Sequence, residues 1–232
     1  QIYYLVNMII VEDIHKSFGD KKVLNSFSAR FEPGKINLII GKSGSGKTMA
    51  IKCMLGLHSV DAGKIIFNDR DFISIRESEK KEIRKEIGMV FQGGALFDSM
   101  TVAENVIFPL QMAQTMSNTK MKERVDFCLN RVDLHNVHTL SPSELSGGMQ
   151  KRVAIARAIA LNPKYLFCDE PNSGLDPTTS IVIDNLLKEI TYEYGITTVI
   201  NTHDMNSVMA IGDNVIFIKE GEKKWEGDKM SL

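Results

Sequence analysis

The sequence predicts an α/β fold in which a mostly parallel sheet with helices is joined by a small antiparallel β subdomain and an inserted α-helical subdomain. Three observations predict this. An apolar strand at 36–40 runs through a glycine-rich loop into a helix at 47–57. A helical pattern occupies 101–160, and short apolar runs then alternate with helices up to residue 219. Strands that alternate with helices indicate parallel pairing, because each helix returns the chain for another strand in the same direction.

The individual elements follow from the apolar pattern and from the turn residues between them. Turns at 18–20 and 32–35 separate the first strands, and Asp61-Ala62-Gly63 leads into a strand of the antiparallel sheet. Pro142-Ser143 interrupts the helical region. Strands are predicted at 9–11, 28–31, 36–40, 64–68, 165–168, 197–201 and 215–219, and helices at 47–57, 77–86 and 178–192, with 205–210 as a further connection.

Composition excludes several classes of protein. A chain of 232 residues with 43% hydrophobic content can form one large domain, or a core domain with a subdomain. Its 28 basic and 29 acidic residues give no excess charge for nucleic acid or an acidic membrane. The widely spaced Cys53, Cys128 and Cys168 suggest neither disulfides nor zinc, and no secretion signal opens the chain. The apolar runs are shorter than the ~20 residues that span a bilayer, so a membrane role would require another chain.

The glycine-rich loop satisfies every fixed position of the Walker A phosphate-binding pattern. Backbone N–H groups of such a loop, at the start of a helix, point at phosphates. Lys47 is expected to neutralise the β- and γ-phosphates, Thr48 to ligate Mg²⁺, and Met49 to join the nucleotide-binding residues. The strand, loop and helix together predict a P-loop NTPase with a RecA-like core. The loop reads Gly41-Lys42-Ser43-Gly44-Ser45-Gly46-Lys47-Thr48.

Two further motifs narrow the class. The apolar run 165–168 followed by Asp169 and Glu170 resembles a Walker B strand, in which Asp169 would hold Mg²⁺ through water and Glu170 would polarise the attacking water. An Asp-Glu pair alone is also a common strand-end turn. Between the two nucleotide motifs stands Leu145-Ser146-Gly147-Gly148-Met149. With the three motifs in this order, the chain resembles the ATP-binding subunits of ABC transporters over roughly 8–232.

The resemblance implies a composite site. Ser146, Gly147 and Gly148 open a predicted helix and would cover the γ-phosphate held by the other subunit of a head-to-tail homodimer. Met149 stands where Gln is more usual in the family, and Asn172, after Glu170, stands where Thr is more usual. Ser146 is also an ordinary helix N-cap, and the two roles do not compete. The implied cofactors are ATP and Mg²⁺.

The same resemblance implies roles for three single residues. His203 matches the switch histidine that contacts the γ-phosphate and the attacking water, and it is placed with Glu170 among the catalytic residues. Gln92 matches the Q-loop glutamine, whose amide can ligate Mg²⁺. Phe18 stands where an aromatic ring stacks on adenine, although a phenylalanine in an amphipathic segment more often belongs to the core.

The family pattern also implies domain limits and partners. It predicts a single nucleotide-binding domain at 8–232, with a core at 8–91 and 164–232 and a helical subdomain at about 92–163. Residues 1–7 are expected to be upstream sequence or additions for expression, with Met8 as the start. The implied partners are integral membrane permease subunits, and the implied location is peripheral, at the cytoplasmic face of the bacterial inner membrane.

The segment after Gln92 bears on the substrate. It resembles the bacterial ATPases that serve phospholipid transport together with a lipid-binding domain protein, so phospholipid transport is predicted. Residues 93–100 are expected to dock a permease coupling helix through exposed Ala95, Leu96 and Phe97; the alternative is that Leu96 and Phe97 anchor the helical subdomain internally. The segment reads Phe91-Gln92-Gly93-Gly94-Ala95-Leu96-Phe97-Asp98.

The sequence leaves other functions within the family open. One is an amino-acid or methionine importer, disfavoured because the sequence stops soon after Trp225-Glu226-Gly227 and leaves no room for a regulatory domain. Another is a non-transport ATPase of the cell-division type, in which the nucleotide state is read as conformation. DNA-repair and translation members are disfavoured by the single nucleotide domain and the lack of a basic stripe, so no nucleic-acid partner is predicted.

Overall fold

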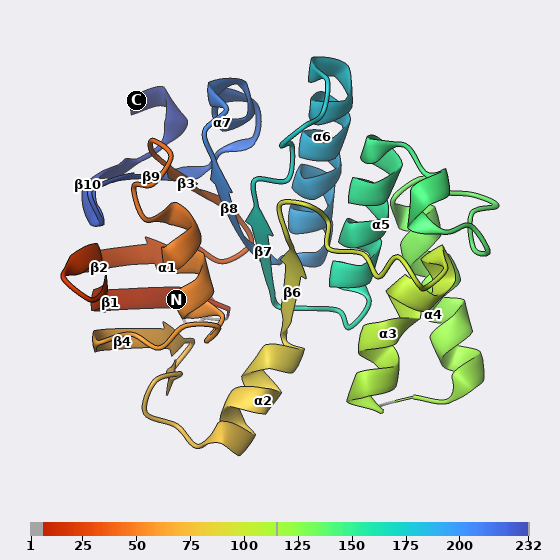
Figure 1. The fold of residues 1–232 in the computed structure, drawn as a ribbon, viewed down its shortest axis with the longest axis horizontal. Coiled ribbons are helices and arrows are strands. Elements are labelled where there is room, and N and C mark those ends of the chain that lie inside the picture. The colour runs from red at the N-terminus through yellow and green to blue at the C-terminus, as the bar shows by residue number, and fades with distance from the viewer. Residues whose placement is uncertain (1–6, 115, 232) are drawn as a thin grey trace.

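A mostly parallel sheet forms the centre of the molecule in the computed structural model, which describes residues 7–114 and 116–231 (Figure 1). Only the two strands at one edge, which a hairpin joins, pair in antiparallel orientation. The spatial order of its strands is β10 (Glu222–Gly227), β9 (Asn214–Lys219), β3 (Ile36–Ile40), β8 (Thr197–Thr202), β7 (Tyr165–Asp169) and β6 (Ile87–Val90).

A smaller antiparallel sheet lies beside the central one. Its spatial order is β2 (Lys21–Phe31), β1 (Ile9–Phe18), β4 (Ala62–Phe67) and β5 (Arg70–Asp71). The predicted strands at 9–11 and 28–31 are therefore too short, because β1 and β2 continue towards their shared turn. Several polar side chains with exposed positions interrupt the apolar pattern along both strands, which hides their length in the sequence.

The central strands are buried on both faces, and alternate side chains enter two different cores. Leu38 of β3 and Leu166 of β7 belong to a cluster with the helices of the inserted region. Ile39 and Phe167, one residue further along the same strands, belong to a cluster with the small sheet and α1 (Lys47–Met54). Strands covered on both faces read as continuous apolar runs, which is why the sequence located them well.

The inserted region consists of separate helices that pack on one another at one side of the molecule, where Figure 1 draws them in green. They are α3 (Val102–Ala113), α4 (Asn118–Arg131) and α5 (Gly147–Ile159), with a 3₁₀ turn at Pro142–Glu144 where the sequence predicts a break. The other helices are α2 (Glu77–Lys85), α6 (Pro177–Tyr194) and α7 (Met205–Ile211), and Lys229–Ser231 forms a last 3₁₀ turn. Within the described ranges, no helix has the length and apolar character needed to cross a membrane.

The prediction misses three strands and overextends one helix. β5 is short, and the charged β10 lacks an apolar alternation. β6 contains Gly88, where a Cβ would lie 2.3 Å from the carbonyl oxygen of Ala158, so glycine allows α5 to approach the strand. α1 ends at Met54 rather than at 57, ahead of Gly56 with a φ of 69°. Of the predicted upstream segment, residues 1–6 lie outside the described part of the chain.

Candidate active site

The glycine-rich loop joins β3 to α1 and takes a conformation that its glycines permit. Gly46 precedes α1 with a φ of 112°, and a Cβ there would lie 2.9 Å from the carbonyl oxygen of Val23. A Cβ on Gly41 would lie 2.3 Å from the carbonyl oxygen of Ile218. Side chains are excluded at both positions, so the loop stays close to the strands while the first N–H groups of α1 remain free for an anion.

Two buried polar side chains of the loop fit a phosphate group. The Lys47 ammonium is buried and donates to the carbonyl oxygens of Gly41 and Lys42, at 2.9 and 3.2 Å. Ser45 Oγ is buried without a hydrogen-bond partner among the described residues. A buried hydroxyl without a partner is costly, and an anion held by the loop would accept a hydrogen bond from it.

Oxygen donors for Mg²⁺ meet at the carboxyl ends of β7 and β8. The Thr48 hydroxyl lies 3.2 Å from Asp169 Oδ1, and Asn201 Nδ2 donates to the same oxygen at 2.6 Å. No group of three His, Cys, Asp or Glu side chains in the described part of the chain forms a metal site. This donor set fits Mg²⁺, which is commonly held by one or two carboxylates together with the phosphates of the substrate.

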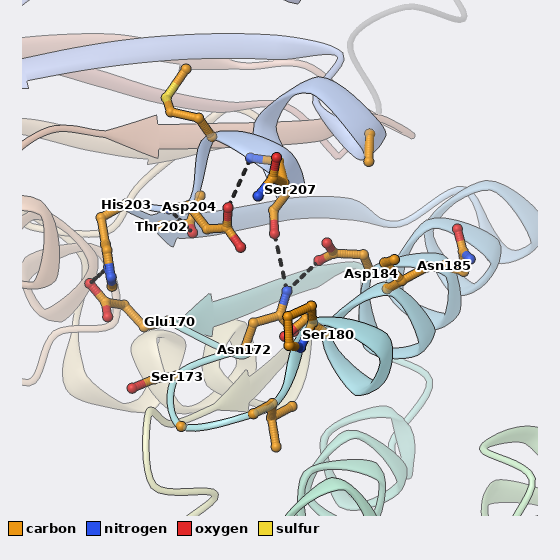
Figure 2. A pocket seen from close by; sticks show the side chains of 17 residues that line it. Glu170, Asn172, Ser173, Ser180, Asp184, Asn185, Thr202, His203, Asp204 and Ser207 are labelled. Atoms are coloured by element: carbon orange, nitrogen blue, oxygen red, sulfur yellow. Dashed lines mark hydrogen bonds and ion pairs between the residues drawn. The ribbon is translucent and has the colours of Figure 1, made fainter.

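Glu170 and His203 face each other beside this donor set. Glu170 Oε1 lies 3.0 Å from His203 Nδ1, and Figure 2 draws this contact as a dashed line. Glu170 follows β7 with a φ of 47°, a left-handed conformation that is uncommon for a residue with a side chain. Its backbone N–H is held by the Asn201 side chain at 2.8 Å. The turn after β7 therefore directs the Glu170 carboxylate towards the cavity described next.

An open cavity of about 660 Å³ collects most of the predicted site residues. Gln92 lines the cavity and donates to Ser173 Oγ at 3.4 Å. The predicted residues Gly41, Lys42, Ser45 and Asp169 are not among its lining residues. Lys21 and Lys22, from the β1–β2 hairpin, add positive charge that suits a polyphosphate. The lining residues are Lys21, Lys22, Val23, Ser43, Gly44, Gly46, Lys47, Thr48, Met49, Gln92, Glu170, His203, Glu220 and Gly221.

Two predicted groups do not line this cavity in a single chain. The Phe18 ring packs edge-on against His58, with ring centroids 5.7 Å apart, and the Lys16 ammonium lies 5.2 Å from its centre. Ser146 caps α5, where its Oγ accepts the Met149 N–H at 3.3 Å, and Gly147 follows it in the first turn. In the segment 145–149, Ser146 and Gly147 are exposed, Gly148 and Met149 are half-buried and Leu145 is buried, and none of the five lines the cavity.

Sequence reasoning missed two buried residues that organise the site. Asn201 binds both Asp169 and the Glu170 backbone, and its only sequence signal is a polar residue at the end of an apolar strand. Lys151 on α5 donates to the Gln92 carbonyl oxygen, and burial lowers the pKa of its ammonium. Because Lys151 stands between the polar Gln150 and Arg152, the sequence gives no signal that it is buried.

The fold and the phosphate-binding loop define a P-loop nucleotide-binding protein. The family model described as ABC transporter matches residues 24–173, and the chain belongs to that family. The predicted fold class is confirmed by a solved dimeric ATP-binding cassette, in a post-hydrolysis state with ADP and Pi. That structure is 32% identical with a TM-score of 0.86, and the match covers 95% of this chain and 98% of the other. The chain is therefore an ABC transporter ATPase that uses ATP with Mg²⁺, as predicted.

Two curated relatives differ in the substrate that their names carry. The methionine import ATP-binding protein MetN of Clostridium acetobutylicum is 41% identical, over 97% of this chain and 70% of the relative. The intermembrane phospholipid transport system ATP-binding protein MlaF of Haemophilus influenzae is 35% identical, over 97% of this chain and 86% of the relative. The family is common to both, and the substrate is a separate question.

Proposed function

We propose that this ATPase powers phospholipid transport through a partner permease at the cytoplasmic face of the bacterial inner membrane. The observation that carries the proposal is the segment 91–98, whose Phe-Gln-Gly-Gly-Ala-Leu-Phe-Asp sequence resembles the ATPases of lipid transporters. The similarity to MlaF along nearly the whole chain supports it. On this proposal, a lipid-binding domain protein completes the assembly.

Methionine import is the second candidate, and a specific observation favours it. Methionine importers outnumber the phospholipid transport protein among the relatives compared, and one of them has the higher identity, 41% against 35%. Overall identity is dominated by the fold and the nucleotide site, which all such ATPases share. The segment after Gln92 lies outside the glycine-rich loop and is the better guide to the permease.

Deletion of the gene for this chain in its source bacterium separates the two candidates. We expect phospholipid exchange between the envelope membranes to slow, while uptake of radiolabelled methionine stays at the wild-type rate. The unaltered gene should restore exchange, and a Lys47→Ala gene should not. Loss of methionine uptake with normal lipid exchange would contradict the lipid proposal and identify an importer.

The site residues support a proposed division of labour in hydrolysis. When bound, ATP supplies the phosphoanhydride bond and Mg²⁺ neutralises charge on its phosphates. Lys47 and the loop N–H groups hold the phosphates, while Thr48 and Asp169 hold the metal, with Gln92 able to join them. Glu170 would orient the attacking water, and His203 would contact that water and the γ-phosphate. Little covalent help is needed, because positioning and electrostatics dominate phosphoryl transfer.

The same proposal assigns residues 93–100 to permease docking. Phe97 is 40% exposed, and its ring centroid lies 4.9 Å from that of Phe108 on α3. A mostly apolar groove of about 380 Å³ opens beside these two rings. Arg157 of α5 donates to the carbonyl oxygens of Gly94 and Ala95, at 2.7 and 2.8 Å. The groove is therefore fixed to the helix that begins within residues 145–149, the signature segment.

One part of the docking expectation needs correction. Leu96 was expected to be exposed with Ala95 and Phe97, but it is half-buried and packs against the core of the helical region. The alternative, an internal anchor, therefore holds for Leu96. Phe97 and Ala95 remain exposed and form the surface that a short apolar helix of the permease would cover.

Phe97→Ala should leave folding and basal ATP hydrolysis of the subunit near wild type while it reduces co-purification with the permease by at least about tenfold and abolishes transport. Truncation of an aromatic side chain that is buried at an interface removes much of the binding free energy of the complex. Phe127→Ala is the matched control, since that ring is 44% exposed on α4, away from the groove. A poorly soluble Phe97→Ala subunit with a lowered melting temperature would show that the ring is core.

A further inference from the structure

Asn172 lies where three segments beside the catalytic pair converge, as Figure 2 shows. It belongs to the turn after β7, two residues beyond Glu170. Its Nδ2 donates to Asp184 Oδ1 on α6 at 2.7 Å and to Ser207 Oγ on α7 at 3.1 Å. Residues of the same three segments line a cavity of about 750 Å³ next to the nucleotide cavity. The amide therefore bridges two helices from a single turn.

The chemistry of this bridge requires an amide. A primary amide offers two N–H donors, and here both are used, whereas the threonine more usual at this position has one hydroxyl donor. Asp184 and Ser207 are only 5% and 4% exposed. Burial raises the pKa of the Asp184 carboxyl, and hydrogen bonds from Ser207 and Asn172 oppose that rise. A carboxylate so deeply buried needs these donors.

The bridge also leaves an acceptor without a partner. Because Asp184 accepts, the amide nitrogen of Asn172 must face it, and Asn172 Oδ1 is then buried with no hydrogen-bond partner in the described ranges. An unpaired buried carbonyl costs free energy. An unpaired buried acceptor next to the catalytic pair points to a role in the site rather than to stability alone.

We propose that Asn172 is a positioning residue for ATP hydrolysis, which ties the turn after Glu170 to the helix after His203. The inference rests on the proposed roles of those two groups. Glu170 is fixed by β7 on one side and by the turn containing Asn172 on the other. His203 stands directly before α7, whose N-cap Asp204 accepts the Asn206 N–H at 2.8 Å. With the bridge intact, the turn and α7 cannot move apart, and the 3.0 Å contact between Glu170 and His203 is kept.

Asn172→Leu tests the inference, because leucine keeps a similar volume and removes both donors. In the purified transporter complex we expect kcat for ATP to fall about ten- to a hundredfold, since misplacement of catalytic groups by about 1 Å costs that much. KM for ATP and binding of a fluorescent ATP analogue should stay within about threefold, because the phosphate loop is untouched. Trapping of ADP by orthovanadate should be lost. Asn185→Ala is the matched control, since Asn185 lines the same cavity and is exposed.

If the Asn172→Leu variant does not fold, Ser207→Ala tests the positioning role of Asn172 instead. It removes the acceptor for Asn172 Nδ2 and a hydrogen bond to Asp184, so it should lower kcat with KM unchanged. Combined with Asn172→Ala it should cause little further loss, because both changes break the same bridge. Wild-type kcat in Asn172→Leu, or additive losses in the double variant, would overturn the inference. So would a parallel loss of ATP binding, which indicates a structural role. Failure of the proposed role of Glu170 is measured separately, as normal turnover by a Glu170→Gln subunit.

Discussion

Glu170→Gln is expected to bind ATP as tightly as the wild type, to lose hydrolysis by about a hundred- to ten-thousandfold, and to accumulate as an ATP-bound dimer. Glutamine keeps the shape of the side chain and the contact at His203, but it cannot accept a proton from water. Binding depends on the phosphate loop, which the substitution leaves unchanged. Phosphate release measures the hydrolysis, and gel filtration with Mg²⁺ and ATP measures the dimer.

Two other variants show whether the effect belongs to Glu170. Glu123→Gln, at an exposed position on α4, should hydrolyse ATP at the wild-type rate. Asp169→Asn should instead lose Mg²⁺-dependent binding, because Asp169 Oδ1 is the carboxylate oxygen beside Thr48. Normal turnover by the Glu170→Gln protein would rule out its assignment as the group that orients the water.

The sequence locates the central strands because burial on both faces leaves them little choice of residues. Tyr165 and Phe167 enter one core while Leu166 enters the other, so the strand is apolar from residue 165 to 168. β1 and β2 face solvent at several positions, and β10 is charged, so the same signal is absent there. Prediction from apolar runs thus succeeds in proportion to how completely an element is buried.

The residues of the candidate site also differ in whether the sequence predicts them. Residues proposed to contact a phosphate or metal directly occur in short motifs, because the spacing of the loop glycines, Lys47 and Thr48 is fixed by local geometry. Asn201 holds Asp169 and the Glu170 backbone from β8, and Asn172 bonds to Asp184 and Ser207, so both asparagines work through hydrogen bonds between separate segments. Nothing in the sequence near either asparagine indicates its partner, so only the fold reveals the contact.

The position of the signature segment indicates how a complete site could be built. Ser146 and Gly147 are exposed at the start of α5, with N–H groups suited to an anion, yet the cavity that holds Lys47 is lined without them among the described residues. A single chain therefore offers two separate phosphate-binding helix starts. The solved cassette with 32% identity is a dimer, and a dimer in which each signature faces the other cavity would use both.

Mixing two inactive variants should restore hydrolysis if the sites are shared between subunits. Ser146→Arg alone is expected to bind nucleotide and lose hydrolysis, because the phosphate loop is intact but the facing site gains bulk where its cap should be. Lys47→Ala alone should lose both. A dimer of one with the other has one site with two intact halves only when loop and signature come from different chains. Random mixing should then recover up to about a quarter of wild-type activity, since half of the dimers are mixed and each has one good site.

The mixing experiment needs a control for added bulk and a check of assembly. Ser78→Arg, at an exposed position on α2, should hydrolyse ATP at the wild-type rate when it is alone. Its mixture with Lys47→Ala should hydrolyse no more ATP than the Ser78→Arg subunits in the mixture account for. Mixed dimers can be isolated through two different tags, which confirms assembly before phosphate release is measured. Isolated mixed dimers without any hydrolysis would contradict the shared site. That result is expected if each site is built within one chain, because each variant chain then lacks one half of its own site. Recovery can arise only if Lys47 of one chain works with Ser146 of the other.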